Sequence, residues 1–242
     1  MITAKNMSVD LGDFHLRNVD LTIEDGEVFA ILGQTGSGKS ILLESLAGLH
    51  DYSTGCVRYD EKPVEELPLR DRRIGFVYQD YSLFPHMKVK DNIAFGLKMH
   101  KVPSFERKRI CREMMEKLHI FHLKERLPGT LSGGEQQRTA LARALVLKPK
   151  ILFMDEPFSA LDPNTRRQMY DLIRQIHQDL DCTIIFVTHN FNDAVELADR
   201  AGIVIRGQLL DVCRSDELFD ENRHPEVCRF LGSRRDLPEK QN

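Results

Sequence analysis

The clearest pattern along the chain is an alternation of short apolar runs with stretches whose apolar residues recur every three or four positions. The apolar runs predict strands at 28–32, 55–59, 74–78, 151–155, 183–187 and 201–205. The periodic stretches predict helices at about 41–47, 163–179 and 194–198. Strands that alternate with helices are typical of a mainly parallel sheet, so we expect an α/β core.

Two segments depart from this alternation. Residues 2–27 alternate apolar and polar positions around a Gly12-Asp13 turn, which predicts an antiparallel hairpin. From about 85 to 149 the apolar residues follow a helical period, as at Ile110, Met114 and Leu118. We therefore expect one domain over 1–232, with the α/β core at about 1–84 and 150–232, a helical subdomain at about 85–149, and a polar tail over 233–242.

Composition narrows the classes of function. The chain has 242 residues, with 34 basic and 37 acidic side chains, so its charge does not favour a nucleic-acid partner. No apolar run approaches the ~20 residues of a membrane-spanning helix, so a protein that serves a membrane would do so from outside the bilayer. The five cysteines form no C-x-x-C pair, which disfavours a disulfide framework or a zinc site and fits a reducing cytosol.

A glycine-rich loop follows the apolar run at 28–32, and its residues are Gly33-Gln34-Thr35-Gly36-Ser37-Gly38-Lys39-Ser40. Its glycines let successive backbone N–H groups face one anion, and the N-terminus of the next helix adds its dipole. In such a loop Lys39 reaches the β- and γ-phosphates of a nucleotide, and the Ser40 hydroxyl is placed to ligate Mg²⁺. The alternative is a glycine-rich turn that contains Lys-Ser by chance, and the flanking strand and helix disfavour it.

Two carboxylates, Asp155 and Glu156, follow the apolar residues at 151–154. Ligands bind at the carboxyl ends of the strands in an open α/β sheet. Asp155 is suited to hold Mg²⁺ through water, opposite Ser40. Glu156 is then the candidate that polarises the attacking water, because a hydrolase must orient or deprotonate its nucleophile. The alternative is that Asp-Glu-Pro only begins a surface turn.

Gln79 and His189 also follow predicted strands. His189 is a candidate contact to the γ-phosphate or to the catalytic water, although a histidine at a strand end can be incidental and Asn190 can simply cap the next helix. The Gln79 amide oxygen can ligate Mg²⁺ while its NH₂ group holds water. The alternative for Gln79 is a polar strand end without a ligand.

The segment Leu131-Ser132-Gly133-Gly134-Glu135-Gln136-Gln137-Arg138 predicts a second helix N-terminus that faces an anion. Ser132 and Glu135 form a capping box, which by itself predicts only a helix start. Each of the two glycines disfavours helix by about 1 kcal/mol relative to alanine, and close approach of an anion would explain them. One chain then has two helix N-termini that face phosphate, but only one glycine-rich loop with a lysine and a serine. We therefore expect a head-to-tail homodimer in which each second site closes over its partner's nucleotide, with Ser159-Ala160-Leu161-Asp162 near the interface.

The ordered set GQTGSGKS, Gln79, LSGGEQQR, ILFMDE, SALD and His189 resembles the ATP-binding subunit of ABC transporters over nearly the whole chain. The resemblance identifies these pieces as Walker A, Q-loop, signature, Walker B, D-loop and H-switch. It implies an α/β P-loop NTPase (RecA-like) core with an N-terminal antiparallel β subdomain and a helical insert, and an Mg²⁺-dependent ATPase that works as a two-site dimer. It also implies an aromatic ring of the hairpin against adenine. Phe14 is the nearest candidate, with a core-facing Phe14 as the alternative.

The run from Tyr81 to Lys90 is unusually apolar for a connection. It can fold its own side chains into the core, or it can form a docking groove for a permease helix, which the resemblance favours. Residues 81–97 are similar to the same region in ATP-binding subunits of importers for oxyanions, polyamines, iron and sugars. Residues 13–16 and 82–87 resemble those of the molybdate/tungstate branch. The resemblance implies a peripheral ATPase on the cytoplasmic side of the cell membrane, bound to integral permease subunits and indirectly served by a solute-binding protein. Many relatives carry a further regulatory β-domain, and we expect no substrate feedback of that kind here.

Three other functions compete with an oxyanion importer. The first is the ATPase of an importer for a polyamine, iron or a sugar. The second is a soluble ABC ATPase of DNA repair or translation, but no long coiled-coil insert, tandem cassette or basic arm is visible. The third is another P-loop enzyme, such as a small-molecule kinase or a GTPase, which leaves LSGGEQQR unexplained and lacks an N-K-x-D guanine motif.

Overall fold

The computed structural model describes residues 1–220 and 222–232, so the predicted tail at 233–242 lies outside the described residues. The chain divides into two compact units, a first unit of Met1–Glu65 with Val187–Asn242 and a second unit of Glu66–Phe186. The expected division into a core and a helical subdomain stays a prediction. Among the described residues, no helix is both long and apolar enough to cross a membrane.

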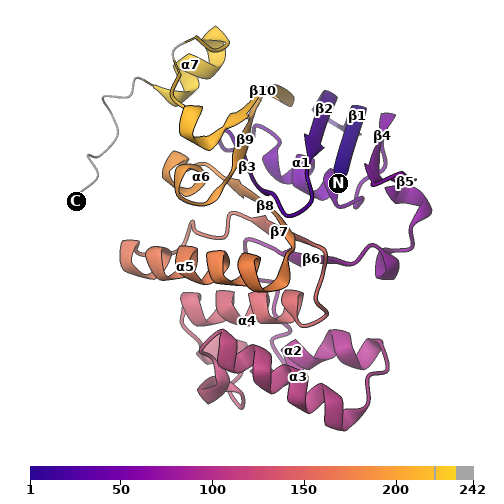
Figure 1. The fold of residues 1–242 in the computed structure, drawn as a ribbon, viewed down its shortest axis with the longest axis vertical. Coiled ribbons are helices and arrows are strands. Elements are labelled where there is room, and N and C mark those ends of the chain that lie inside the picture. The colour runs from indigo at the N-terminus through magenta and orange to yellow at the C-terminus, as the bar shows by residue number, and fades with distance from the viewer. Residues whose placement is uncertain (221, 233–242) are drawn as a thin grey trace. The chain divides into compact units, whose positions relative to one another are not determined.

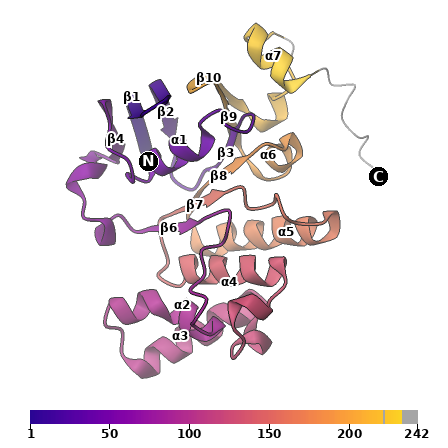
Figure 2. The same ribbon diagram turned by 180° about the vertical axis from the view of Figure 1, so that it is seen from behind.

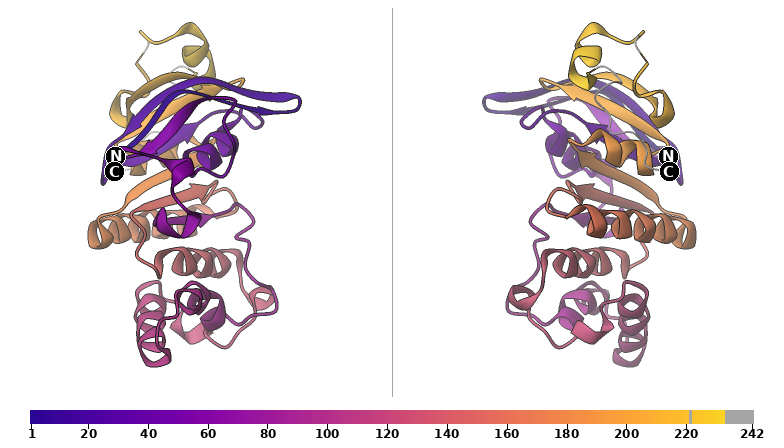
Figure 3. Two further views of the ribbon diagram at one scale, coloured as in Figure 1. Left: turned by 90° about the vertical axis from the view of Figure 1, so that its right-hand side faces the viewer. Right: turned by 90° about the vertical axis from the view of Figure 1, so that its left-hand side faces the viewer.

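An antiparallel sheet forms part of the first unit. The strands β1 (Ile2–Leu11) and β2 (Phe14–Ile23) pair as a hairpin around Gly12, whose φ is +60°, so the predicted hairpin is confirmed. Figure 3 shows this hairpin as two long adjacent strands joined by a turn. The strand β4 (Thr54–Tyr59) pairs with β1, and the short β5 (Lys62–Pro63) pairs with β4. Alternate residues of β1 are buried, as its apolar and polar alternation predicts.

The first unit also holds the strand that precedes the glycine-rich loop. This strand, β3 (Val28–Leu32), is wholly buried and lies parallel to β9 (Arg200–Ile205), with Leu32 opposite Ile203. The helix α1 (Lys39–Leu46) follows the loop, and α6 (Phe191–Leu197) packs against β3. The predicted strands and helices are confirmed here, with α6 beginning earlier than expected because Asn190 caps it.

Besides the two-residue β5, the strand β10 (Gln208–Arg214) and the helix α7 (Pro225–Leu231) of the first unit were not predicted. The strand β10 pairs antiparallel with β9 through a turn in which Arg206 and Gly207 both have positive φ. Such a turn favours a hairpin, so the Arg-Gly pair was a usable signal. The helix α7 has only seven residues, too few for a clear apolar period, although proline at its first position is a start signal.

The strands of the second unit run parallel. The strand β6 (Ile74–Val77) pairs with β7 (Ile151–Asp155), and β8 (Thr183–Thr188), which ends in the first unit, lies beside β7. The helix α5 (Pro163–Leu180) buries Met169, Ile173 and Ile176 along one face, at the spacing that predicted it. The predicted strands and this helix are therefore confirmed.

Three further helices of the second unit pack on one another, as Figures 1 and 2 show from opposite sides. They are α2 (Val89–Met99), α3 (Ser104–Lys117) and α4 (Gly133–Leu145), and α2 contacts both of the others. On α3 the predicted apolar face buries Met114, and Leu118 after it is also buried, while Ile110 stays half-buried. The helical pattern that the sequence shows between 85 and 149 is thus present.

Candidate functional site

The glycine-rich loop from Gly33 to Ser40 joins buried β3 to α1. The helix begins at Lys39, and its N-cap is Gly38, which has a φ of +100° and no side-chain cap. The Lys39 side chain is 5% exposed, and its Nζ donates to the Gln34 carbonyl at 2.9 Å. The Ser37 N–H donates to the same carbonyl at 3.1 Å, so the loop curls around the ammonium group. A helix N-terminus without a capping side chain, beside a buried lysine, fits the phosphates of a nucleotide.

Two glycines of the loop are required for different reasons. A Cβ on Gly33 would lie 2.4 Å from both the Ser37 Oγ and the Val204 carbonyl oxygen, so there is no room for a side chain. Gly36 has a φ of +79°, and a Cβ there would meet nothing within 4 Å. The open space above Gly36 is what a loop that admits a ligand to its backbone requires.

Replacing Gly33 with alanine is expected to destabilise the protein and to weaken nucleotide binding. The Val204 oxygen belongs to the backbone of β9, so the strand or the loop must shift, at a cost of about 1–3 kcal/mol. Thermal unfolding and titration with a fluorescent ATP analogue measure the two effects. Gly129→Ala is the matched control, since a Cβ there meets nothing within 4 Å and Gly129 lies outside the glycine-rich loop. A Gly33→Ala protein as stable as the parent would contradict the steric argument.

Phe14, the candidate for adenine, lies at the start of β2 and is half-buried. Its Cζ would be 2.4 Å from a Cβ on Gly38 and 3.5 Å from one on Gly207. The hairpin aromatic therefore packs against the backbone of the phosphate loop. Its contact with adenine stays a prediction.

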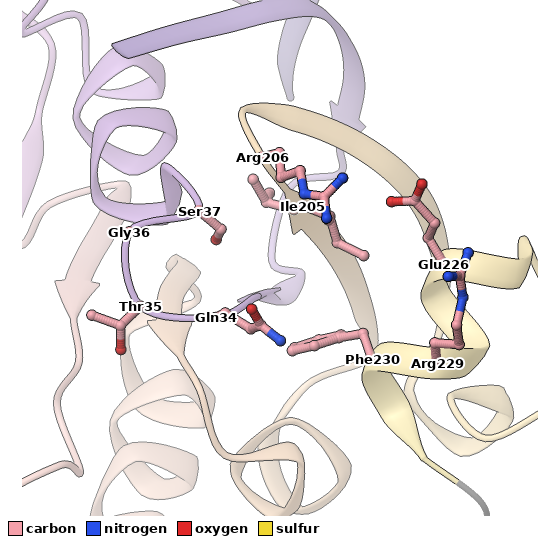
Figure 4. A pocket seen from close by; sticks show the side chains of 10 residues that line it. Gln34, Thr35, Gly36, Ser37, Ile205, Arg206, Glu226, Arg229 and Phe230 are labelled. Carbon is pink, nitrogen blue, oxygen red and sulfur yellow. The ribbon is translucent and has the colours of Figure 1, made fainter. Parts of the chain in front are cut away.

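A pocket of about 330 Å³ lies beside the loop in the first unit. Its lining comes from Gln34–Ser37, from residues 204–206 after β9, and from Glu226, Arg229 and Phe230 of α7. Figure 4 shows the Gln34 amide directed toward the Phe230 ring and the Thr35 side chain turned away. Ser37 is 7% exposed, and its hydroxyl has no hydrogen-bond partner within the described part of the chain. Sequence reasoning missed Arg206 and α7 because nothing local places them beside the loop.

His189 follows β8 directly and is exposed. Hydrogen bonds of Thr188 before His189 and of Asn190 after it hold the turn that carries His189. The Asn190 N–H donates to the Thr188 hydroxyl at 3.0 Å, and that hydroxyl donates to the buried Asp193 carboxylate. The Asn190 side chain accepts from the Asn192 N–H at 3.0 Å, so its predicted capping role is confirmed. The role of His189 toward phosphate or water stays a prediction.

The two carboxylates of the second unit differ in environment. Asp155 ends β7 and is 8% exposed, whereas Glu156 is half-buried and has a φ of +45°. A non-glycine residue in this left-handed region carries strain that its surroundings must offset. The Ser159 N–H and Oγ both donate to the Glu156 carbonyl, at 3.3 and 3.0 Å. The turn that the alternative interpretation expected is present, and it holds Glu156 in this conformation.

Gln79 lies two residues beyond the end of β6 and is exposed. Val77 is opposite Met154 in the parallel pair, so Gln79 and Asp155 both follow the carboxyl edge of these two strands. A carboxylate and an amide oxygen are ligands that suit Mg²⁺. The donor set on this edge therefore fits the predicted metal.

The predicted capping box at the start of α4 is confirmed. The Ser132 N–H donates to the Glu135 carboxylate at 2.7 Å, and the Glu135 N–H donates to the Ser132 Oγ at 3.4 Å. The bond from Ser132 holds the pKa of Glu135 below its usual range. A Cβ on Gly133 would meet nothing within 4 Å, and one on Gly134 would lie 3.3 Å from Thr165 Cγ2. The chain itself gives no steric reason for Gly133, so the open tip fits the approach of another molecule.

Asp162 lies beside this tip and caps α5. Its carboxylate accepts the N–H groups of Asn164 and Thr165 at 3.1 Å each. A further bond from the Thr165 hydroxyl is the main cause that lowers the pKa of Asp162. Because a Cβ on Gly134 would lie 3.3 Å from the Thr165 Cγ2, the start of α5 after Asp162 and the tip of α4 are neighbours.

A buried glutamine, Gln137 of α4, donates its amide to the Pro157 carbonyl that follows the two carboxylates. Sequence reasoning quoted Gln137 only as part of a motif and assigned it no contact. The predicted site residues are thus divided between the two units of the chain. The first carries the glycine-rich loop, Phe14 and His189, and the second carries Gln79, Asp155, Glu156, Ser132–Glu135 and Asp162.

Comparison with known proteins gives consistent matches. A family model described as ABC transporter matches residues 16–159. The molybdate/tungstate import ATP-binding protein WtpC of Pyrococcus horikoshii is 44% identical over 232 residues, which are 96% of this chain and 67% of that protein. The sulfate/thiosulfate import ATP-binding protein CysA of Methylococcus capsulatus is 42% identical over 236 residues, 96% of this chain and 68% of that protein.

Solved structures share the fold. A dimeric ATP-binding cassette in a post-hydrolysis state with ADP and Pi has a TM-score of 0.80 at 30% identity, covering 89% of this chain and 99% of its own. The cbiO1 protein of Clostridium perfringens, part of the ABC transporter complex cbiONQ, has a TM-score of 0.82 at 30% identity, covering 95% of this chain and 93% of its own. The expected α/β P-loop NTPase fold is thereby confirmed.

Proposed function

Because this chain belongs to the ABC transporter family as an ATP-hydrolysing subunit, we propose that it energises the import of an oxyanion such as molybdate, tungstate or sulfate. The observation that carries the proposal is the likeness to import ATP-binding proteins for these oxyanions over 96% of the chain. Importers of polyamine, iron or sugar remain the alternative to be tested.

The proposed ATP site uses the glycine-rich loop and the polar residues at the strand ends, each in a stated role. Lys39 and the backbone N–H groups of residues 36–40 bind the phosphates, and Phe14 contacts adenine. Ser40, Gln79 and Asp155 would hold Mg²⁺, which would offset charge on the β- and γ-phosphates. Glu156 orients and deprotonates the attacking water, with His189 beside it. The uncapped N-terminus of α1 and the oxygen donors at one strand edge support these roles.

The proposed working form is a homodimer. The tip of α4 in each copy, from Ser132 to Glu135, closes on the nucleotide held by the other, with Asp162 near the contact. Support comes from the open space in front of Gly133 and from the similar cassette that was solved as a dimer. Binding of ATP would bring the two copies together, and hydrolysis would let them separate.

The proposed membrane partner is an integral permease on whose cytoplasmic face the subunit docks through residues 81–97, while a solute-binding protein delivers the oxyanion. The competing interpretation was a loop that buries its own side chains. In the structure every residue from 81 to 88 is half-buried or exposed, which supports an available surface, whereas Val89 is buried as the competing interpretation expects.

ATP-dependent uptake of labelled molybdate or sulfate is the test of this function, measured in vesicles from cells that express the chain with its permease. Lys39→Ala is expected to abolish uptake, because the phosphates lose their lysine. Uptake of a polyamine, iron or a sugar instead of either oxyanion would support the alternative importer. A chain that stays in the supernatant when membranes are sedimented would contradict a transport role altogether.

A further inference from the structure

The segment 81–88, which follows Gln79, is held at one end by an arginine of α4. The Arg143 Nη1 donates to the Ser82 carbonyl at 2.7 Å, and its Nη2 donates to the Tyr81 carbonyl at 3.0 Å. The guanidinium carbon lies 5.2 Å from the centre of the Phe84 ring. Tyr81 and Ser82 have φ values of +62° and +42°, so these bonds hold a backbone conformation that non-glycine residues rarely adopt.

The other end of the segment is held by α2. Asn92 is fully buried, accepts the Phe84 N–H at 2.9 Å, and donates to the Phe84 and Met87 carbonyls at 3.1 and 2.9 Å. The Phe84 ring also packs on Phe95 of α2, with centroids 4.7 Å apart. The segment is therefore held by Arg143 of α4 and by Asn92 of α2, and the Arg143 bonds are the ones that attach it to α4.

The two Arg143 bonds end on main-chain oxygens, so they fix the position of the backbone. The guanidinium is half-buried, and burial lowers the pKa of Arg143 although the Asp80 carboxylate opposes this. A planar fork that spans two successive carbonyls cannot be reproduced by lysine, whose ammonium is a single point of charge. The contact is thus specific to arginine.

Arg143 lies on the same helix as the open tip at Gly133. Ten residues separate them, which is about 15 Å along an α-helix at 1.5 Å per residue. A helix of this length is stiff, so a displacement of its N-terminus also displaces Arg143. The carbonyls of Tyr81 and Ser82 would then be carried with it.

We propose that Arg143 is a positioning residue that clamps the segment 81–88 to α4, so that the helix tip and the segment move as one body. The inference rests on the proposed function, in which the tip meets a partner's nucleotide and the segment meets the permease. Arg143 itself contacts neither. Closure on ATP at one end of α4 is transmitted to the permease side through these two hydrogen bonds.

Hydrogen exchange of peptides within 81–88 tests the clamp in the purified full chain. Arg143→Lys is expected to speed exchange of these amides by about ten-fold, the equivalent of one lost hydrogen bond from a charged group. Arg112→Lys is the matched control, since Arg112 lies 5.3 Å over the Phe121 ring and pairs with Glu116 on α3. Unchanged exchange in Arg143→Lys would overturn the clamp. If Arg143→Lys does not fold, Arg143→Met, which keeps an unbranched side chain over the Phe84 ring but removes both donors to the Tyr81 and Ser82 carbonyls, decides by the same comparison.

The transmission step is tested with the same readout in a Glu156→Gln background, with and without ATP and Mg²⁺. The parent is expected to change its exchange at 81–88 when ATP is added, and Arg143→Lys is expected to lose at least half of that change while still forming the dimer. A full response in Arg143→Lys would overturn the inference and leave the proposed dimer intact. A parent that stays monomeric by light scattering would instead refute the proposed function, and this inference with it.

Discussion

Replacing Glu156 with glutamine is expected to lower ATP turnover by about 10²- to 10⁴-fold while ATP binding is retained, as the loss of a general base predicts. The amide has the shape of the carboxylate but cannot take the proton of the attacking water. The turn itself should persist, because the Ser159 bonds that hold it end on the Glu156 carbonyl and not on the side chain. Phosphate release and nucleotide titration measure the two quantities separately.

The same variant is expected to accumulate as an ATP-bound dimer, since closure precedes hydrolysis and the step that separates the copies is blocked. Size-exclusion chromatography with light scattering detects the dimer. Glu113→Gln is the control, because it makes the same chemical change in an exposed ion pair with Arg109 on α3. Turnover equal to the parent in Glu156→Gln would remove Glu156 from the mechanism.

Replacing Gly133 with aspartate is expected to abolish ATP-dependent dimer formation and to reduce turnover by about a hundred-fold or more. The new carboxylate would stand where the tip of α4 faces the partner's triphosphate, so like charges would meet. Within its own chain a Cβ at position 133 meets nothing within 4 Å. An acidic residue in the first turn of a helix is stabilising by about 0.3–1 kcal/mol, so the monomer should be as stable as the parent or slightly more stable.

Gly129→Asp is the matched control, because a Cβ on Gly129 also meets nothing within 4 Å. This variant adds the same charge in the same unit, close to the tip in sequence, and should keep both dimer and turnover. Thermal unfolding, sedimentation with ATP and phosphate release are measured on all three proteins. A Gly133→Asp protein that dimerises normally would show that the tip does not face the nucleotide.

Much of the fold follows from signals within a few residues. Serine three positions before glutamate predicted the capping box of α4, and Asp162 before Pro163 marks the start of α5. The buried strands β3, β7 and β8 were recognised because each contains a short run of four or five consecutive apolar residues. The loop at Gly33–Ser40 was recognised because its spacing of glycines, lysine and serine is itself the chemistry of phosphate binding.

Contacts between residues far apart in the chain were not predictable in this way. Arg143 reaches carbonyls more than 60 positions earlier, and no residue near it in the sequence indicates that contact. The packing of Phe14 on Gly38, and the placement of α7 across the pocket from the glycine-rich loop, depend equally on how distant segments pack. The helix α7 is too brief for a helical period, and β10 shows neither a continuous apolar run nor a regular alternation of apolar and polar residues.

The amino-acid sequence alone therefore determined the local elements, the glycine-rich loop between strand and helix, the capped helix tip and the resemblance to a family, because each of these is encoded in residues that are adjacent or one helical turn apart. Only the tertiary structure decided which side chains lock the segment 81–88, why Gly33 admits no side chain while Gly133 has open space, and what lines the pocket beside the loop. The physical reason is that such contacts arise from packing between segments distant in sequence, where residue spacing carries no information.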